Sequence, residues 1–162
     1  VVVVASSSQA NLDKVYIPNE VYIKDDIYVN KKLGFQISLS AFKVNSTTTL
    51  EKIFIEEDGT QNERVIFVNK SKEVSNSKNG IIGVSSLKEA SITNLDAVKN
   101  DHNRQVEWLS DSVVDGERMI EGIPSQGDQF GYIIHKGKLY SIGGDLLIGY
   151  GRERLSTLKF ID

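Results

Sequence analysis

Two histidines are the side chains in this chain best suited to proton transfer or metal binding. His102 falls on the apolar stripe of a predicted helix, where a hydrogen-bonded, partly buried imidazole is the common outcome. No second ligand follows it at a His-x-x-x-His or Glu-x-x-His spacing. His135 ends a predicted strand beside a turn, which favours solvent exposure. Neither imidazole is therefore assigned a catalytic or metal-binding role.

Two carboxylates form the strongest candidate for a cation site. Glu107 and Asp111 lie four residues apart on the predicted helix, where they could share a hard cation such as calcium, and Asp115 follows nearby. Carboxylates at this spacing are usually solvated surface groups, and the EF-hand pattern is absent. We therefore predict no metal site, while a cation between Glu107 and Asp111 stays open.

Nucleophile and phosphate-binding motifs give no catalytic or cofactor site. Ser85, Ser86 and Ser125 stand in ordinary strand or turn contexts, and no Gly-x-Ser-x-Gly elbow is present. The segment 144–151 is rich in glycine but matches neither phosphate-loop pattern, so it predicts a turn leading into a helix. No cofactor is expected, and the chain is predicted not to be an enzyme.

Exposed tyrosines remain as candidates for recognition. A tyrosine side chain offers a large amphipathic contact area at low entropic cost. The possible interaction surface comprises Tyr16, Tyr22 and Tyr150. The alternative is that all three belong to the core or its rim.

Composition limits the class of protein and of partner. The 162 residues carry 25% charged and 40% hydrophobic side chains, which is typical of one globular domain. A net charge of -3 gives no excess of Lys and Arg for phosphates, so nucleic acid is not an expected partner. Without cysteine there is neither a disulfide nor a thiolate nucleophile. No stretch is long and apolar enough to predict a transmembrane segment.

The first 26 residues read as an N-terminal arm. Residues 1–10 are four valines followed by small residues, which fits the tail of a secretory signal, a sequence added for expression, or a disordered or strand-forming end. Val-Tyr-Ile then occurs at 15–17 and again at 21–23. Such an arm could add a strand to its own sheet or to a second copy of the chain.

Residues 27–162 are predicted to form one domain. The alternation of Phe35, Ile37 and Leu39 with polar residues indicates a half-buried strand, which the turn residues 30–34 join to the short strand 27–29 in a hairpin. Further strands are predicted at 51–57, 64–68, 80–87, 117–123, 131–135, 138–142 and 158–161, and helices at 91–109 and 146–155. The predicted fold class is α+β: an antiparallel β-sheet of about six to eight strands with helices packed on its faces.

The order of four segments resembles the PsbP-like superfamily, which includes the photosystem II extrinsic protein, Mog-like proteins and bacterial PsbP-like lipoproteins. The segments are 28–39 (YVNKKLGFQISL), 120–125 (IEGIPS), 137–142 (GKLYSI) and 154–161 (RLSTLKFI). Where that family usually has Pro and Trp after the second strand, this chain has Ser40, Ala41 and Phe42. The resemblance implies a noncatalytic adaptor at the cell envelope, and it supplies no catalytic residues. The cysteine that carries the lipid in such lipoproteins is missing.

Three functions are consistent with these observations. The leading hypothesis is a noncatalytic extracytoplasmic binding or adaptor domain, secreted or associated with the cell envelope, for an unknown protein or small ligand. The second is a small hydrolase or ligand-processing enzyme with a cleft near His102, Glu107 and Asp111. The third is a structural protein that self-associates, as a homodimer, through the N-terminal arm.

Overall fold

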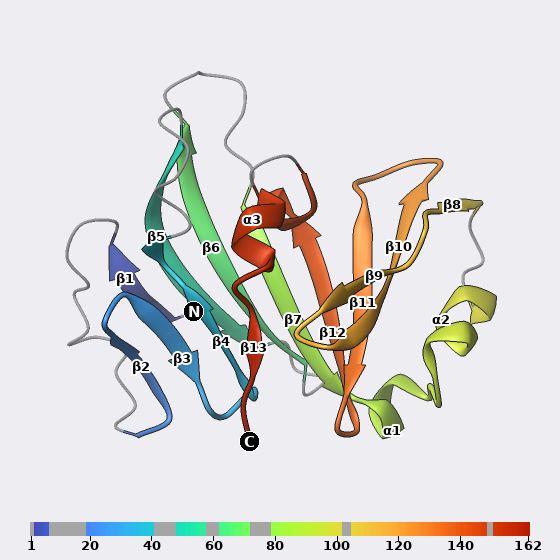
Figure 1. The fold of residues 1–162 in the computed structure, drawn as a ribbon, viewed down its shortest axis with the longest axis horizontal. Helices are drawn as coiled ribbons and strands as arrows, with labels where there is room; N and C mark the ends of the chain where they lie inside the picture. Colours follow the sequence, from blue (N-terminus) through green and yellow to red (C-terminus); the bar gives the residue numbers. More distant parts are fainter. Residues whose placement is uncertain are drawn as a thin grey trace.

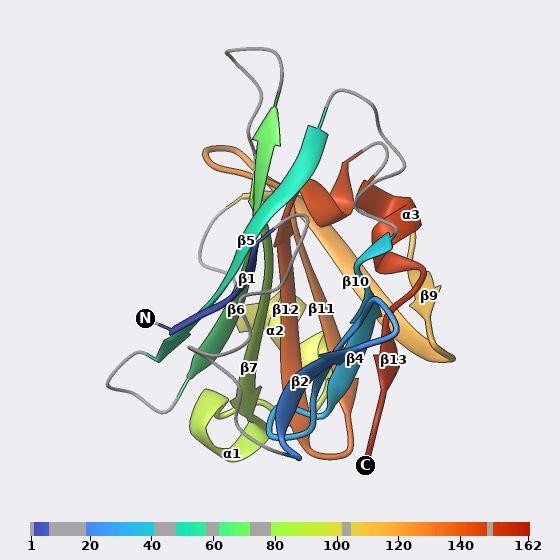
Figure 2. The ribbon, with the colours of Figure 1, turned by 90° about the vertical axis from the view of Figure 1, so that its left-hand side faces the viewer.

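Two antiparallel β-sheets face each other in the computed structural model, which describes residues 2–6, 19–40, 48–57, 62–71, 79–101, 105–148 and 151–162. Figure 1 shows the smaller sheet in front of the larger one, and Figure 2 shows the two layers from the side. The larger sheet has nine strands, in the order β1 (Val2–Ser6), β5 (Thr48–Glu57), β6 (Glu63–Ser71), β7 (Gly80–Ser86), β12 (Lys138–Gly144), β11 (Phe130–His135), β10 (Glu117–Pro124) and β8 (Val106–Trp108), with β9 (Ser112–Val114) also paired to β10.

The smaller sheet and one short helix cover the inner face of the larger sheet. Its four strands run in the order β13 (Lys159–Phe160), β4 (Phe35–Ser38), β3 (Ile27–Asn30) and β2 (Val21–Lys24). The 3-10 turn η3 (Asp145–Leu147) and the helix α3 (Gly151–Leu155) lie on the same side (Figures 1 and 2). No helix of the described residues is long and apolar enough to cross a membrane.

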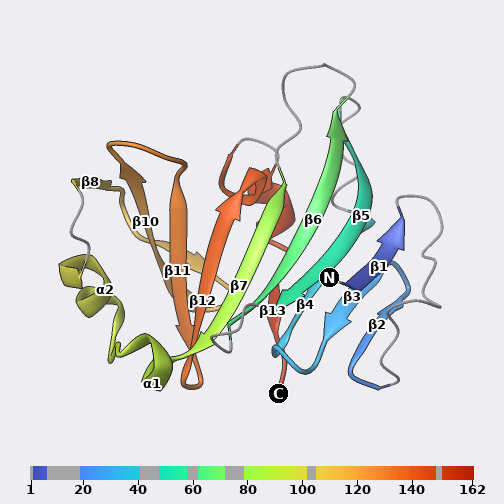
Figure 3. The ribbon, with the colours of Figure 1, turned by 180° about the vertical axis from the view of Figure 1, so that it is seen from behind.

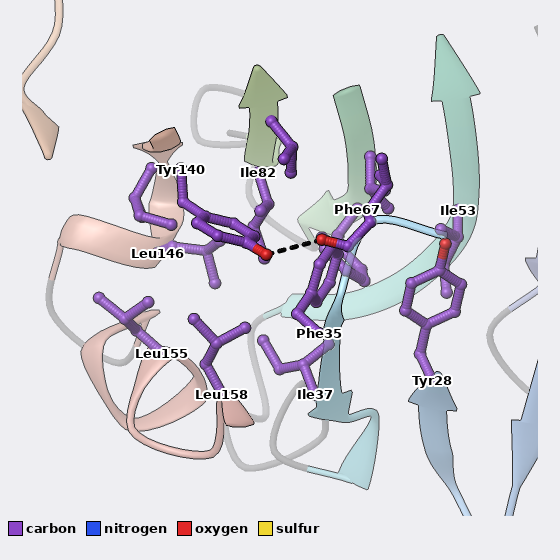
Figure 4. Packing of buried hydrophobic residues seen from close by; sticks show 14 of the residues in the cluster. Tyr28, Phe35, Ile37, Ile53, Phe67, Ile82, Tyr140, Leu146, Leu155 and Leu158 are labelled. Atoms are coloured by element: carbon purple, nitrogen blue, oxygen red, sulfur yellow. Dashed lines mark hydrogen bonds between the residues drawn. The ribbon is translucent and has the colours of Figure 1, made fainter. Parts of the chain in front are cut away.

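Alternating side chains build the core between the sheets. Phe67 on β6 and Phe35 on β4 are fully buried, and both rings pack against Tyr28 on β3, with ring centroids 5.8 and 6.0 Å away. Figure 4 shows side chains from both sheets, η3, α3 and the segment after α3 meeting in this core. Burying these apolar side chains is the main driving force that joins the layers.

Two buried tyrosine hydroxyls find hydrogen-bond partners inside the core. Tyr140 donates to the backbone carbonyl of Leu33 at 2.7 Å, as the dashed line in Figure 4 marks. Tyr28 accepts a bond from the amide group of Asn30 at 3.0 Å. Burial raises the pKa of Tyr140 to about 12 and raises the pKa of Tyr28 further. Both hydroxyls therefore stay protonated at physiological pH.

The opposite, outer face of the large sheet carries a second apolar cluster under two short helices. The helices are α1 (Leu87–Ala90) and α2 (Leu95–Asp101), seen at one end of the sheet in Figure 3. Leu95 and Val98 of α2 pack against Ile120 and Leu139 of the sheet. The helices begin after hydrogen-bonding side chains: Ser86 accepts from the amide of Glu89 at 3.1 Å.

The predicted α+β class is wrong. The chain is a β-rich protein, and the face that helices were expected to cover is covered mainly by the four-stranded sheet. The individual strands predicted at 27–29 and 158–161 exist, as β3 and β13, but they form a second layer instead of extending the first. Partition of strands between two sheets depends on contacts distant in sequence, which local periodicity does not report.

The two predicted helices are shorter than expected. The segment 91–109 is helical only from Leu95 to Asp101, and Val106–Trp108 forms the strand β8. The segment 146–155 is interrupted between η3 and α3. At Gly151 a side chain would meet the carbonyl oxygen of Asp145 at 1.3 Å, so glycine is required where the two turns cross.

Strands also occur within the predicted arm, residues 1–26. β1 pairs antiparallel with β5 of the large sheet, from Val2 opposite Ile55 to Ser6 opposite Lys52. β2 pairs with β3 in the small sheet. Residues 7–18, including the first Val-Tyr-Ile, lie outside the described part of the chain.

A carboxylate fastens the last strand to the large sheet. Asp115, in the turn between β9 and β10, accepts hydrogen bonds from the backbone amide of Phe160 at 2.8 Å and from Lys159 at 3.1 Å. The hydrogen bond from the Phe160 backbone N–H is the main reason that the pKa of Asp115 lies below its ordinary value. The Lys159 ammonium lowers this pKa further. Phe160 also stacks on His135, with ring centroids 4.4 Å apart.

The Phe160 amide signal is therefore expected to report the titration of Asp115. A carboxylate with a lowered folded pKa stabilises the folded state above its unfolded value of about 3.9, and this contribution is lost as the pH falls through the folded pKa. We expect the NMR shift of the Phe160 amide to titrate with a midpoint below about 3.9. Asp115→Asn should abolish that titration and Asp96→Asn should not; a midpoint at or above the unfolded value contradicts the assignment.

Candidate functional site

A cleft with a volume of about 280 Å³ opens on the outer face of the large sheet. Figure 3 looks onto this face, where α1 and α2 lie at the end near β10 and β11 and leave the ribbons of β6 and β7 in view. The walls come from four neighbouring strands and comprise Asn62, Glu63, Arg64, Gly83, Val84, Ser85, Tyr132, Leu139 and Ser141. The volume lies just below the range of about 300–1,000 Å³ that is usual for small-molecule sites.

The hollow forms because Gly83 has no side chain. Strand register places Arg64, Gly83, Ser141 and Tyr132 directly opposite one another on β6, β7, β12 and β11, so all four positions share the outer face. A side chain at Gly83 would begin 2.4 Å from the Ser141 hydroxyl and 3.5 Å from the Arg64 Cγ atom. Glycine thus leaves room between two longer neighbours.

Two serine hydroxyls, those of Ser85 and Ser141, line the cleft. Ser141 lies beside Gly83, and Ser85 is two residues further along β7, opposite Leu139. Neither hydroxyl has a hydrogen-bond partner within the part of the chain that the structure describes. A serine hydroxyl both donates and accepts, so these two groups can bond to a ligand in either sense.

The charges at the cleft are compensated within the protein. Arg64 donates to Glu56 on the neighbouring β5 at 2.9 Å, whereas Glu63, the residue before it on β6, faces the inner side and forms an ion pair with Lys32 at 3.0 Å. About half of the Arg64 side chain is exposed (51%), so its pair is a solvent-screened one. Each charged wall residue is therefore part of a neutral pair.

Apolar groups line the side of the cleft nearest the helices. Tyr132 and Leu139 belong to the outer cluster beneath α1 and α2. Burial raises the pKa of the Tyr132 hydroxyl above its ordinary value, which keeps it neutral. The ring of Phe130, two residues before Tyr132, packs against the rings of Tyr132 and Trp108, with centroid distances of 5.5 and 5.7 Å. The wall is therefore stiffened by packed rings.

Most of the predicted recognition surface lies outside the described residues. Tyr16 and Tyr150 are among the residues that the structure does not describe, and so is His102. Tyr22 on β2 is half-buried, with the ammonium of Lys31 5.7 Å from its ring centroid. Tyr22 is thus placed on the small sheet, whereas the cleft opens on the outer face of the large sheet.

His135 is not simply solvent-exposed as predicted. Its side chain is 18% exposed, its Nδ1 atom lies 2.8 Å from Glu117, and its ring stacks on Phe160. These contacts join the end of β11 to β10 and to the last strand. The imidazole therefore has structural contacts on the inner face of the sheet, opposite to the outer face that carries Ser141.

Glu107 and Asp111 are not neighbours on a helix. Glu107 lies on β8 opposite Ile123 of β10. Asp111 instead accepts a hydrogen bond at 2.6 Å from the guanidinium of Arg118, which is five residues before Ile123 on β10. The Arg118 bond is the main cause of the lowered pKa of Asp111. Among the described residues no group of three or more His, Cys, Asp or Glu side chains is placed to hold a metal ion.

The remaining motif residues have separate places. Ser85 lines the cleft, Ser86 caps α1, and the amide of Ser125 donates to the carbonyl of Gln105 at 3.0 Å. Gly144 adopts a φ of 68°, which a tight turn toward Asn79 requires, since a side chain there would meet the Asn79 carbonyl at 1.6 Å. The glycine-rich segment is thus a turn where the structure describes it.

Sequence reasoning missed Arg64, Gly83, Ser141 and Tyr132 as a set. The available signal was the run of small and polar residues at alternate positions of adjacent strands, Gly83 and Ser85 on one and Ser141 on the next. Comparison with known protein families, curated proteins and solved structures finds no significant match.

Proposed function

We propose that this chain is a noncatalytic binding domain and that its ligand occupies the outer-face cleft. The observation that supports this function is the convergence of donor and acceptor groups from three adjacent strands on one hollow beside Gly83. Sheet hydrogen bonds fix these strands before a ligand arrives. Binding there would order few additional groups, which favours recognition by a preformed site.

The chemistry of the cleft suits hydrogen bonding better than proton transfer. Nucleophilic catalysis by a serine requires a base within hydrogen-bond reach of its hydroxyl. The one described imidazole, His135, is instead engaged with Glu117 and Phe160. Ser85 and Ser141 are therefore assigned as binding groups.

The cellular setting stays a prediction. The resemblance to PsbP-like proteins supports an adaptor at the cell envelope, located outside the cytoplasm, and an unknown protein or small ligand as partner. The cleft is compatible with either partner, because a small ligand or one side chain of a protein would fit a volume of about 280 Å³.

Filling the hollow is expected to abolish binding. In ¹H–¹⁵N NMR spectra of the full chain, a mixture of small polar fragments should shift the amide signals of Gly83, Ser85 and Ser141. Gly83→Ala should remove these shifts, since the new methyl group would displace the Ser141 hydroxyl into the hollow. Its φ does not lie in the left-handed region, so alanine is sterically allowed in the backbone.

Gly143→Ala is the matched control. Gly143 lies on β12, two residues after Ser141 and on the same face, and a side chain there meets only Ile81 at 3.9 Å. This variant should bind fragments like the wild type. Fragment shifts that spread over the surface without favouring the cleft, or that survive unchanged in Gly83→Ala, would overturn the proposal.

A further inference from the structure

We infer that the cleft takes a neutral, hydroxyl-bearing ring about the size of one sugar residue. This inference rests on the proposed function, because it names the ligand class of the same site. It follows from three features of the cleft: its charge balance, its hydrogen-bonding groups and its apolar wall.

The charge balance disfavours an ionic ligand. Arg64 is paired with Glu56 at 2.9 Å, and Glu63, whose side chain faces the inner side of β6, is paired with Lys32 at 3.0 Å, so neither pair leaves a net charge at the cleft. An anion would have to compete with Glu56 for the guanidinium, and among the residues that line the cleft no carboxylate faces it to bind a cation. A neutral ligand can accept a hydrogen bond from the guanidinium without separating its ion pair.

The hydrogen-bonding groups match a hydroxyl-rich molecule. Ser85 and Ser141 each donate and accept, and the guanidinium of Arg64 donates. A hydroxyl on the ligand also does both, so it can pair with any of these groups. A ligand with several hydroxyls could therefore use both serines at once.

The apolar wall completes the match. Tyr132 and Leu139 stand on the helix side of the cleft, across from Arg64 in the order of the strands. A sugar ring has an apolar C–H face and a polar hydroxyl rim. The C–H face can bury apolar area against Tyr132, which is only half-buried, while the rim reaches the serines. The volume of about 280 Å³ is suited to one such ring.

The test is an NMR titration of the ¹⁵N-labelled full chain with glucose, galactose and N-acetylglucosamine, beside glutamate and methylguanidinium at the same concentrations. At least one sugar is expected to shift the amides of Gly83, Ser85 and Ser141, with both ions leaving them in place. Ser85→Ala and Ser141→Ala should each weaken sugar binding by about 2- to 10-fold, the equivalent of one hydrogen bond. Ser125→Ala, remote from the cleft residues, should not change it.

Failure of the ligand class and failure of the proposed function give different results. If glutamate or methylguanidinium shifts the cleft amides and the sugars do not, the neutral class is wrong and the binding site stands. The same conclusion follows if only the polar fragment mixture binds. If neither the fragments nor any of these five probes shifts the cleft amides, the proposed function falls together with the ligand class.

Discussion

Phe67→Ala is expected to lower the free energy of unfolding by about 3–5 kcal/mol, the range for a fully buried phenylalanine. Phe67 is 0% exposed on the inner face of β6. Its ring meets Tyr28 of the small sheet edge to face, with centroids 5.8 Å apart. Truncation would remove apolar contact from both layers at once and leave a cavity that the paired strands cannot close. Urea unfolding followed by circular dichroism measures the loss.

Ile66→Ala is the matched control. Ile66 is the next residue on the same strand, but it points to the outer face and is only half-buried. The alternation of a strand predicts less than half of the Phe67 effect at this position. Equal losses in the two variants would contradict the assignment of inner and outer faces. Phe67→Leu should recover part of the stability, because it retains most of the buried volume.

Local signals were sufficient to predict the strands 131–135 and 138–142, which form the β11–β12 hairpin. Lys136 and Gly137 both have positive φ, of 45° and 77°, and form the two-residue turn that joins β11 to β12. Asp115 and Gly116 form the same kind of turn between β9 and β10, with φ of 48° and 81°, although no strand was predicted at 112–114. In each case glycine supplies the second left-handed position of the turn, between runs of apolar residues. Such information is contained in a few consecutive residues.

Pairing between distant segments was not predictable in the same way. β13 pairs with β4, Lys159 lying opposite Gln36, although more than 120 residues separate them in sequence. Both strands are short, and nothing in their own residues distinguishes a strand of the small sheet from one of the large sheet. The α+β prediction failed at this step, since it assigned all strands to one layer.

The helix predicted over 91–109 shows a further limit of periodicity. Leu95 and Val98 do lie on the buried face of α2, as their spacing predicted. Val106 and Trp108, however, alternate with Glu107 in the strand β8 and pair with β10. A few apolar residues fit a period of two or of 3.6 equally well. Pairing with β10 decides the outcome, and that contact is distant in sequence.

The cleft depends on register as well as on composition. Arg64, Gly83, Ser141 and Tyr132 become a row only after three strand pairs have been aligned. A shift of one residue in any pair would move a member to the inner face. A list of serines and glycines from the sequence therefore contains the members of the site without their arrangement.

Arg154→Ala is expected to be as destabilising as the loss of Phe67, at about 3–5 kcal/mol. The Arg154 side chain is 2% exposed, and its guanidinium donates to the carboxylate of Asp145, which is itself 17% exposed. Removing the guanidinium would leave that carboxylate buried without the arginine charge. Arg64→Ala removes an arginine from a surface ion pair and should cost at most about 1 kcal/mol.

A double variant separates charge from packing. Asp145→Asn with Arg154→Met removes both charges while keeping side chains of similar size. If the uncompensated carboxylate causes the loss, the double variant should be more stable than Arg154→Ala alone, since a buried ion pair can be replaced by uncharged groups at small cost. A double variant as unstable as the single one would assign the loss to packing instead.

The deficit of Arg154→Ala should also depend on pH. Burial raises the pKa of Asp145, and the Arg154 charge partly opposes that rise, so removing the arginine would raise this pKa further. A carboxyl group with a raised folded pKa favours the folded state fully below its unfolded value of about 3.9 and loses that contribution as the pH rises through the folded pKa. The stability difference between wild type and variant should thus be small at pH values below the unfolded pKa and widen toward neutral pH. Urea unfolding of both proteins across this range measures it, and a difference that narrows as the pH rises would show that Asp145 is not the buried charge responsible.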